Sequence, residues 1–274
     1  MSSITRFLPK NHLSYLTGLL VHIRLPAFLN RFIIANFAKA YHIRLDEAEL
    51  SYEQYPSLGE FFVRKLKPGL RPLGQTWALH PADSVITQAA VIREGQLVQA
   101  KNKFYTLPSF TRDQESLKKY DNGFFLTYYL CPTDYHRVHS PVTGKIKRVL
   151  HIPGALWPVN SWSTENVHEL FSINERVVVE IETDRGLVSA VFVGATNVGK
   201  IELAFDREII GNQLIAETIK EKSYQNLPIK KGEELGLFRM GSTVVMIYAP
   251  GTINPKELSG FHGKPVKVNS DFSN

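Results

Sequence analysis

The sequence predicts an α+β protein, with a mainly antiparallel β core and an N-terminal amphipathic helical part. Up to residue 72, apolar side chains recur at the spacing of helices. After Pro72, short runs rich in β-branched and aromatic residues alternate with turns that contain Gly, Pro, Asn or Asp. A chain of 274 residues is long enough for one sizeable core, and no obvious linker separates the two parts.

Two amphipathic helices are predicted, one on each side of Pro26. The first carries Leu13, Leu16, Leu20 and Ile23, and the second carries Leu29, Ile33, Phe37 and Tyr41. Their apolar faces either pack on the protein's own core or lie in the surface of a bilayer, and periodicity alone leaves both open. Six Lys or Arg precede Asp46, the first acidic residue, within a net charge of +6. Basic and apolar together favour an anionic membrane surface over nucleic acid.

A third, short helix is predicted to begin at Ser57. Ser57-Leu-Gly-Glu60 has the spacing of a capping box, and an apolar run follows it. Pro68, Gly69 and Pro72 are expected to end this helix. We therefore divide the chain into a helical, membrane-associating region, residues 1–72, and a β-rich catalytic domain, residues 73–274.

The β-rich region shows its strands most clearly in four segments: 125–130, 177–181, 187–193 and 243–248. Turn residues punctuate them at 121–123, 153–154, 184–186 and 250–251. One helix is expected to intervene near residues 164–171. The glycine-rich loop 194–199 is either a phosphate cradle or a turn, and a turn near the active site is favoured.

Cys131 is the one cysteine, so the fold contains no internal disulfide. This fits a reducing compartment such as the cytoplasm. Cys131 is either a nucleophile or a small core residue, and the second interpretation is favoured. We expect neither a transmembrane helix nor a secretory signal, because no apolar stretch reaches about 18 residues and no cleavage pattern follows one.

Gly241 and Ser242 precede the last predicted strand. Taken alone, Gly-Ser before a strand is typical of a turn. A Gly-Ser bond held in a strained turn also lets the serine hydroxyl attack the preceding carbonyl, because glycine has no side chain to crowd it. The amide becomes an ester, elimination leaves dehydroalanine, and hydrolysis yields a pyruvoyl group. This route requires a base to activate the hydroxyl.

His136 and His139 are candidates for that base. Three interpretations remain open for the pair: half of a metal site, for which no companion cluster is found at ligand spacing, two structural histidines, or a general base with a pKa near neutral. Asp83 is either a solvated turn residue or the acid that orients a histidine in an Asp/His/Ser relay. Sequence spacing does not show that the three residues meet.

Several motifs together carry a resemblance that no single one carries. In chain order they are Glu60-Phe-Phe-Val-Arg64, His80-Pro-Ala-Asp83, Gln99-Ala-Lys101, Asp134-Tyr-His-Arg-Val-His139, Val193-Gly-Ala-Thr-Asn-Val-Gly199 and Gly236-Leu-Phe-Arg-Met-Gly-Ser-Thr-Val-Val245. With these motifs the chain resembles the phosphatidylserine decarboxylase family along nearly its whole length.

The resemblance implies a role for each matching residue. Asp83, His139 and Ser242 match the relay of self-cleavage, and His136 matches the histidine of the decarboxylation step. Cleavage between Gly241 and Ser242 would leave a β chain, 1–241, and an α chain, 242–274. Ser242 would become a covalent pyruvoyl cofactor that forms a Schiff base with the substrate amine, with no metal. The reaction would convert phosphatidylserine to phosphatidylethanolamine in phospholipid biosynthesis.

The resemblance also implies partners and a location. The substrate and an anionic membrane surface would be the partners, and nucleic acid would not. The α and β chains would form a heterodimer that itself pairs into a homodimer, peripheral on the cytoplasmic side of the inner membrane. Two positions depart from the family pattern: Ser84 stands where Gly is usual, and Met240 where Leu is usual. Neither departure removes a group that the chemistry needs.

Two rival functions are considered for a chain with these residues. A serine hydrolase would use Ser242, His139 and Asp83 without self-cleavage, although the serine is not in a Gly-x-Ser-x-Gly elbow. A β-rich membrane-binding module without enzymatic activity would need none of them.

Overall fold

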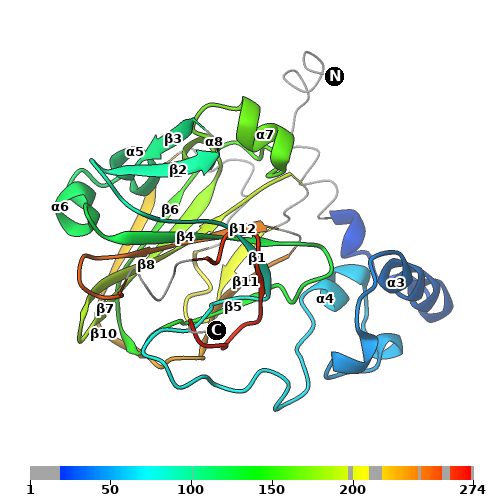
Figure 1. Ribbon diagram of the computed structural model, residues 1–274. Coiled ribbons are helices and arrows are strands. Elements are labelled where there is room, and N and C mark those ends of the chain that lie inside the picture. The colour runs from blue at the N-terminus through cyan, green and yellow to red at the C-terminus, as the bar shows by residue number, and fades with distance from the viewer. Residues whose placement is uncertain are drawn as a thin grey trace.

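The middle layer of the protein is an eight-stranded antiparallel sheet (Figure 1). The computed structural model describes residues 19–100, 102–196, 200–209, 218–239, 242–254 and 260–272. The strands of this sheet follow the order β10-β6-β7-β8-β12-β4-β1-β13. Their bounds are β1 Ser84–Val91, β4 Phe124–Leu130, β6 Gly144–Ile152, β7 Arg176–Thr183, β8 Gly186–Val193, β10 Lys220–Ile229, β12 Ser242–Tyr248 and β13 Pro265–Val266. The predicted α+β class with a mainly antiparallel β core is confirmed.

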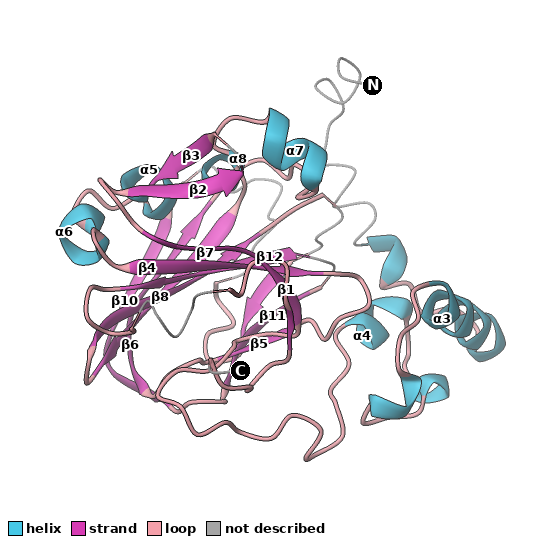
Figure 2. Ribbon diagram, viewed as in Figure 1, coloured by secondary structure: helices cyan, strands magenta, loops and turns pink. Residues whose placement is uncertain are grey.

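Separate layers cover the two faces of the sheet (Figure 2). One face carries a three-stranded sheet in the order β5-β11-β9, and Phe238 from this sheet contacts Phe192 of β8, with ring centroids 5.3 Å apart. The other face carries the β2-β3 hairpin and helices α5 to α8, and Tyr120 of α6 shares a 2.7 Å hydrogen bond with Ser189 of β8. The bounds in these layers are β2 Gln96–Ala100, β3 Lys103–Thr106, β5 Arg137–His139, β9 Ile201–Leu203, β11 Glu234–Phe238, α5 Leu107–Thr111, α6 Ser116–Tyr120, α7 Ser161–Asn166 and α8 Leu170–Ile173.

Burial on both faces explains why some strands were easy to find in the sequence. In β7, β8 and β12 almost every described side chain is buried, so the sequence there is a near-continuous apolar run rather than an alternating one. The four predicted strand segments are confirmed as β4, β7, β8 and β12, each within two residues of its expected ends.

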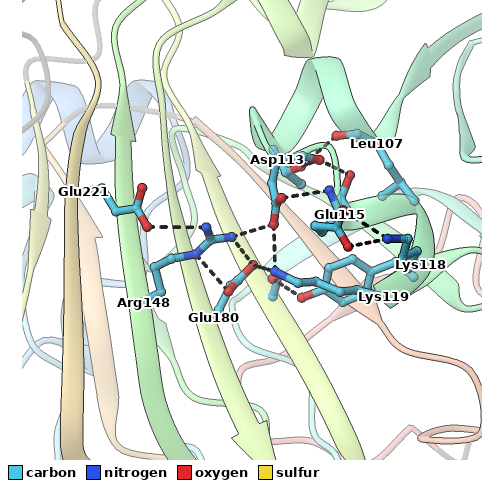
Figure 3. Close-up of polar contacts among 12 residues, drawn as sticks. Leu107, Asp113, Glu115, Lys118, Lys119, Arg148, Glu180 and Glu221 are labelled. Atoms are coloured by element: carbon cyan, nitrogen blue, oxygen red, sulfur yellow. Dashed lines mark hydrogen bonds and ion pairs between the residues drawn. The ribbon is translucent and has the colours of Figure 1, made fainter.

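An ion-pair network fastens the helical layer to the sheet (Figure 3). Arg148 of β6 donates to Glu180 of β7 and, at 2.7 Å, to Asp113 in the α5–α6 loop. Lys119 of α6 donates to Asp113 at 2.7 Å. The network therefore joins two strands, one helix and one loop through partly buried charges, and it lies on the face of the sheet that α6 covers.

The N-terminal part contains α3 Ala27–Ala40, the short 3₁₀ turns η1 Leu45–Glu47 and η2 Tyr52–Gln54, and α4 Leu58–Phe62. The helix predicted after Pro26 is confirmed as α3. Of the helix predicted before Pro26, residues 19–21 are helical and residues up to 18 lie outside the described residues. Among the described helices, none has the length and apolar character needed to span a bilayer.

Helix α3 has two apolar faces. Ile34 and Ala38 lie on the face buried against η2 and α4, where Asn30 also donates its side-chain amide to the carbonyl of Tyr55. Phe28 and Phe32 lie on the opposite face and are 76% and 65% exposed. One face therefore packs on the protein itself, while the other remains uncovered.

Helix α4 begins as predicted and ends earlier than predicted. The Ser57 hydroxyl accepts a hydrogen bond from the Glu60 backbone N–H at 3.2 Å, so Ser57 is its N-cap. The helix ends at Phe62, before the predicted stop at Pro68. The Glu60 carboxylate pairs with Arg239 at 2.7 Å, which fixes α4 beside the end of β11.

The single helix expected near residues 164–171 is wrong, since two short helices stand there. Glu169 has a left-handed backbone with φ of 47°, which separates α7 from α8. The side-chain amide of Gln99 donates to the carbonyls of Thr164 and Val167, both at 2.8 Å. Gln99 therefore caps the C-terminal end of α7.

Candidate active site

The candidate residues lie at strand ends, along the edge of the central sheet where β4 ends and where β1 and β12 begin. Ser242, the first residue of β12, pairs with Leu130, the last residue of β4. Val85 of β1 pairs with Tyr129 of β4, so Asp83 lies just before β1 at this same edge. Since one strand separates β1 from β12, their backbones are about 10 Å apart. The sheet thus brings the Asp83 turn and Ser242 to neighbouring positions.

The three-stranded sheet adds the two histidines to this edge. Its strand β11 leads through residues 239–241 into β12, and the N–H of Phe238 donates to the carbonyl of His136 at 3.1 Å. The N–H of His139 donates to the carbonyl of Pro81 at 2.8 Å, which ties β5 to the loop that carries Asp83. Backbone hydrogen bonds therefore join all three segments that the sequence singled out.

Asp83 is fully buried and surrounded by donors. Its carboxylate accepts hydrogen bonds from Arg71 at 2.6 Å, from Lys267 at 3.1 Å and from the N–H of Val268 at 2.9 Å. Burial by itself raises the pKa of Asp83, but the Arg71 hydrogen bond and the Lys267 charge outweigh it and hold the pKa below its usual value. Asp83 is a fixed negative charge. Among the described contacts it forms no hydrogen bond with His139.

His139 is held as a neutral imidazole whose Nε2 is the acceptor. Its Nδ1 lies 2.8 Å from the carbonyl of Gly232, and a carbonyl only accepts, so Nδ1 carries the proton. The Nε2 atom is then an acceptor, 3.1 Å from the Tyr135 hydroxyl. Burial lowers the pKa of His139, while the hydrogen bond to the Gly232 carbonyl and the charges of Glu234 and Asp83 act in the opposite direction. This tautomer suits a general base.

His136 is buried completely and has one unused nitrogen. Its Nδ1 donates to the carbonyl of Asp134 at 2.9 Å, which leaves Nε2 as the acceptor. Nε2 has no hydrogen-bond partner among the described residues. The ring packs on Phe62 of α4 with centroids 4.1 Å apart, and burial lowers the pKa of His136 to about 3. A buried, neutral, unpartnered nitrogen is a group prepared for a ligand or a reacting proton.

The described residues bring together Asp83, His136, His139 and the backbone of Ser242. Gly241 and the Met240 departure lie outside the described residues. Ser84 occupies the first position of β1, where its hydroxyl donates to the carbonyl of Ala82. In the part of the chain that the structure describes, no group of three or more His, Cys, Asp or Glu side chains is arranged to hold a metal ion.

Sequence reasoning missed the residues that hold these groups in place. Arg71 lies 12 positions before Asp83 and Lys267 lies 184 positions after it, and nothing in their local sequence marks them as partners of Asp83. Tyr135 stands next to His136 in the sequence, so the histidine motif itself points to it. Arg64 is buried and donates to the carbonyl of Thr133 at 3.1 Å, which braces the turn before His136.

The surroundings of Cys131 and of Gly194 in the glycine-rich loop fit structural roles. The Cys131 thiol is half-buried and its pKa is raised by burial, which opposes thiolate formation. Gly194 packs against Leu156 and the Glu175 carbonyl, and its own carbonyl accepts from Asn174 at 2.9 Å. Residues 197–199 lie outside the described residues.

Comparison with known proteins connects this geometry to one family. The family model described as phosphatidylserine decarboxylase matches residues 58–272. A phosphatidylserine decarboxylase proenzyme of Myxococcus xanthus is 39% identical over 249 residues, covering 90% of this chain and 88% of the relative. The protein of that name in Anaeromyxobacter is 38% identical, covering 91% and 89%. Its counterpart in Vibrio parahaemolyticus is 36% identical, covering 97% and 95%.

Proposed function

The chain belongs to the phosphatidylserine decarboxylase family, and from that premise we propose that it converts phosphatidylserine to phosphatidylethanolamine and carbon dioxide in phospholipid biosynthesis. The observation that carries the proposal is that the Ser242 end of β12 lies beside the segments that carry two neutral histidines, the buried His136 and the partly buried His139. One of them, His136, has an unpartnered nitrogen. The relatives bear the name proenzyme, which supports processing of this chain as well.

We propose that the chain cuts itself between Gly241 and Ser242. Nε2 of His139 takes the proton of the Ser242 hydroxyl, and the oxygen attacks the Gly241 carbonyl carbon. The C–N bond breaks, and the serine nitrogen takes up the proton, so the amide becomes an ester. Loss of the Cα proton and departure of the Gly241 carboxylate leave dehydroalanine. Water replaces its nitrogen, ammonia is released, and residue 242 ends as a pyruvoyl group.

Asp83 supports this step as a fixed charge. The protonated His139 is stabilised by the negative charges of Glu234 and of the buried Asp83 carboxylate. Arg71 and Lys267 keep the carboxylate ionised and in place. The loop between Pro81 and Asp83 holds the backbone of His139, so charge and base keep one geometry.

A pyruvoyl group fits the residues at this edge. Its two adjacent carbonyls would accept the electrons of the carbon–carbon bond that breaks when the substrate loses its carboxyl group. No protein side chain can accept electrons in this way, so a cofactor supplies this chemistry. His136 brings a lone pair on Nε2 that is buried and has no partner among the described residues. We propose that Nε2 takes a proton from the substrate's ammonium group and later returns it to the carbon that has lost carbon dioxide.

We propose that the uncovered face of α3 lies against an anionic membrane, on the cytoplasmic side of the inner membrane. Phe28 and Phe32 are largely exposed there, and Arg24, Arg31 and Lys39 lie on or beside the same helix. Burying a Phe side chain contributes about 1.5–3 kcal/mol, and each cation near an anionic surface about 1 kcal/mol. The acyl chains of the substrate would stay in the bilayer.

The two chains stay together in this proposal. The α chain would supply β12 and β13 to the central sheet, and the β chain the remaining strands. We further propose that this α/β unit pairs into a homodimer, as the family resemblance suggests.

Intact-mass spectrometry of the purified protein is the direct test. The wild type is expected to give two fragments, the smaller beginning with a pyruvoyl-blocked residue 242, and Ser242→Ala is expected to stay full-length and inactive. Hydroxylamine, which reacts with the pyruvoyl carbonyl, should abolish decarboxylation. A full-length wild-type chain with full decarboxylase activity would sink the self-cleavage proposal.

A further inference from the structure

A cavity of about 390 Å³ lies against the first residues of β12. It lies between the central sheet and the layer formed by β2 and α7. Thr243 lines it from β12, Gln99 from β2, and Thr164 and Glu165 from α7. The function proposed above assigns no role to this cavity.

Three buried polar atoms in the cavity lining have no hydrogen-bond partner among the described residues: the Gln99 oxygen and the hydroxyls of Thr127 and Thr243. The Thr243 hydroxyl is fully buried, and Gln99 is 3% exposed. The amide nitrogen of Gln99 is occupied by the carbonyls of Thr164 and Val167, so its orientation is fixed and its oxygen is the free atom. Neither the Gln99 oxygen nor the Thr243 hydroxyl has a hydrogen-bond partner among the described residues. Buried acceptors of this kind usually meet a ligand or ordered water.

The cavity is within reach of the reacting atom. In the mature protein the carbon that reacts would be the former Cα of residue 242, and adjacent Cα atoms are about 3.8 Å apart. Successive side chains of a strand point to opposite faces, so a ligand that contacts the Thr243 hydroxyl lies within several ångströms of that carbon rather than against it. This inference rests on the proposed pyruvoyl chemistry.

The lining selects the charge of the ligand. Most of the lining side chains carry hydroxyls or amides, the one carboxylate is that of Glu165, and the one imidazole is that of His262. None of the described residues that line the cavity is Lys or Arg. Phosphate sites in proteins rely on such cations or on clustered backbone N–H groups, whereas an ammonium group seeks acceptors and a carboxylate.

We propose that this cavity binds the ammonium end of the serine headgroup, with the Gln99 oxygen and the Thr243 hydroxyl as acceptors and Glu165 as the attracting charge. The phosphate stays outside, toward the lipid. The cavity thereby presents the amine to residue 242 and selects lipids whose headgroup ends in a primary amine.

The test compares variants of the mature enzyme. Gln99→Leu is expected to raise KM for phosphatidylserine in mixed micelles about tenfold with kcat within twofold, and Glu165→Gln to raise it about threefold. Gln96→Leu is the matched control, because Gln96 is exposed on the same strand. Glycerophosphoserine and phosphoethanolamine should inhibit the wild type competitively, while glycerol 3-phosphate, which lacks the amine, should not.

The outcomes separate the two proposals. An uncut or inactive wild type refutes the proposed function. An active wild type with the same KM in the Gln99→Leu and Gln96→Leu proteins overturns the cavity assignment alone, as does equal inhibition by glycerol 3-phosphate. If the Gln99→Leu protein fails to mature, the Glu165→Gln protein decides, because the Glu165 carboxylate is exposed and its loss leaves the fold intact. An inhibition constant for glycerophosphoserine that is the same in the Glu165→Gln protein and the wild type then overturns the assignment.

Discussion

His80 makes the free energy of unfolding depend on pH, and substitution of this one residue tests the effect. The imidazole is fully buried between the rings of Phe261 and Phe272, with its Nδ1 3.1 Å from the Tyr128 hydroxyl. Burial lowers the pKa of His80 to about 4, from an ordinary value of 6.5. The unfolded chain therefore takes up this proton at a higher pH than the folded chain does.

The direction and size of the effect follow from that difference. The stability contribution is fully present above about pH 6.5 and is lost as the pH falls through 6.5 toward 4. Each pKa unit corresponds to 1.36 kcal/mol, so His80 removes about 2 kcal/mol of unfolding free energy between pH 7 and pH 5. Replacing His80 by Phe keeps a ring in the pocket and eliminates the titration. It also leaves the Tyr128 hydroxyl unpaired, which costs about 1–3 kcal/mol at either pH.

The assay is urea unfolding of the uncut Ser242→Ala chain at pH 7 and pH 5. We expect the loss of unfolding free energy between the two pH values to be smaller by about 2 kcal/mol in the His80→Phe chain. His168→Phe, at an exposed position, is the control and should keep the full loss. An equal loss in the His80→Phe chain and its parent would refute the reasoning.

Three further predictions concern the relay charge, the membrane face and the ion-pair network. Asp83→Asn should slow self-cleavage at least tenfold in a gel time course, because protonated His139 loses its stabilising charge; cleavage at the wild-type rate contradicts this role. Phe28→Asp combined with Phe32→Asp should lower sedimentation with anionic vesicles at least tenfold, whereas Leu117→Asp, at a position of α6 that is 40% exposed, should not. Arg148→Met should cost about 2 kcal/mol in urea unfolding, since Asp113 and Glu180 lose their shared cation, and should leave decarboxylation by the folded enzyme unchanged.

The sequence predicted best what depends on neighbours in the chain. The strands β4, β7, β8 and β12 are apolar because both faces of the sheet are covered, and this shows directly in their composition. The start of α4 follows from one hydroxyl, that of Ser57, which accepts from a backbone N–H three residues later. The end of α4 did not follow, because the helix stops before the proline is reached.

The candidate site depended on contacts that no local pattern contains. Asp83 accepts from Arg71, 12 positions earlier, and from Lys267, 184 positions later. Those partners are set by the pairing of β1 with β13 and by the loop before β1, which sequence spacing does not reveal. For the same reason the residues alone left Asp83, His136 and His139 ambiguous, and family resemblance was needed to group them with Ser242.

The position of β12 has a consequence for how the mature protein loses its fold. β12 is an interior strand, hydrogen-bonded to β8 on one side and β4 on the other, and after the proposed cut it would belong to a separate short chain. Unfolding would release that chain, and refolding would require a free peptide to insert between two strands in the correct register, a slow encounter of distant partners. The uncut precursor folds as one molecule, whereas the mature enzyme is expected to denature irreversibly. Its useful lifetime is then set by the rate of unfolding rather than by an equilibrium.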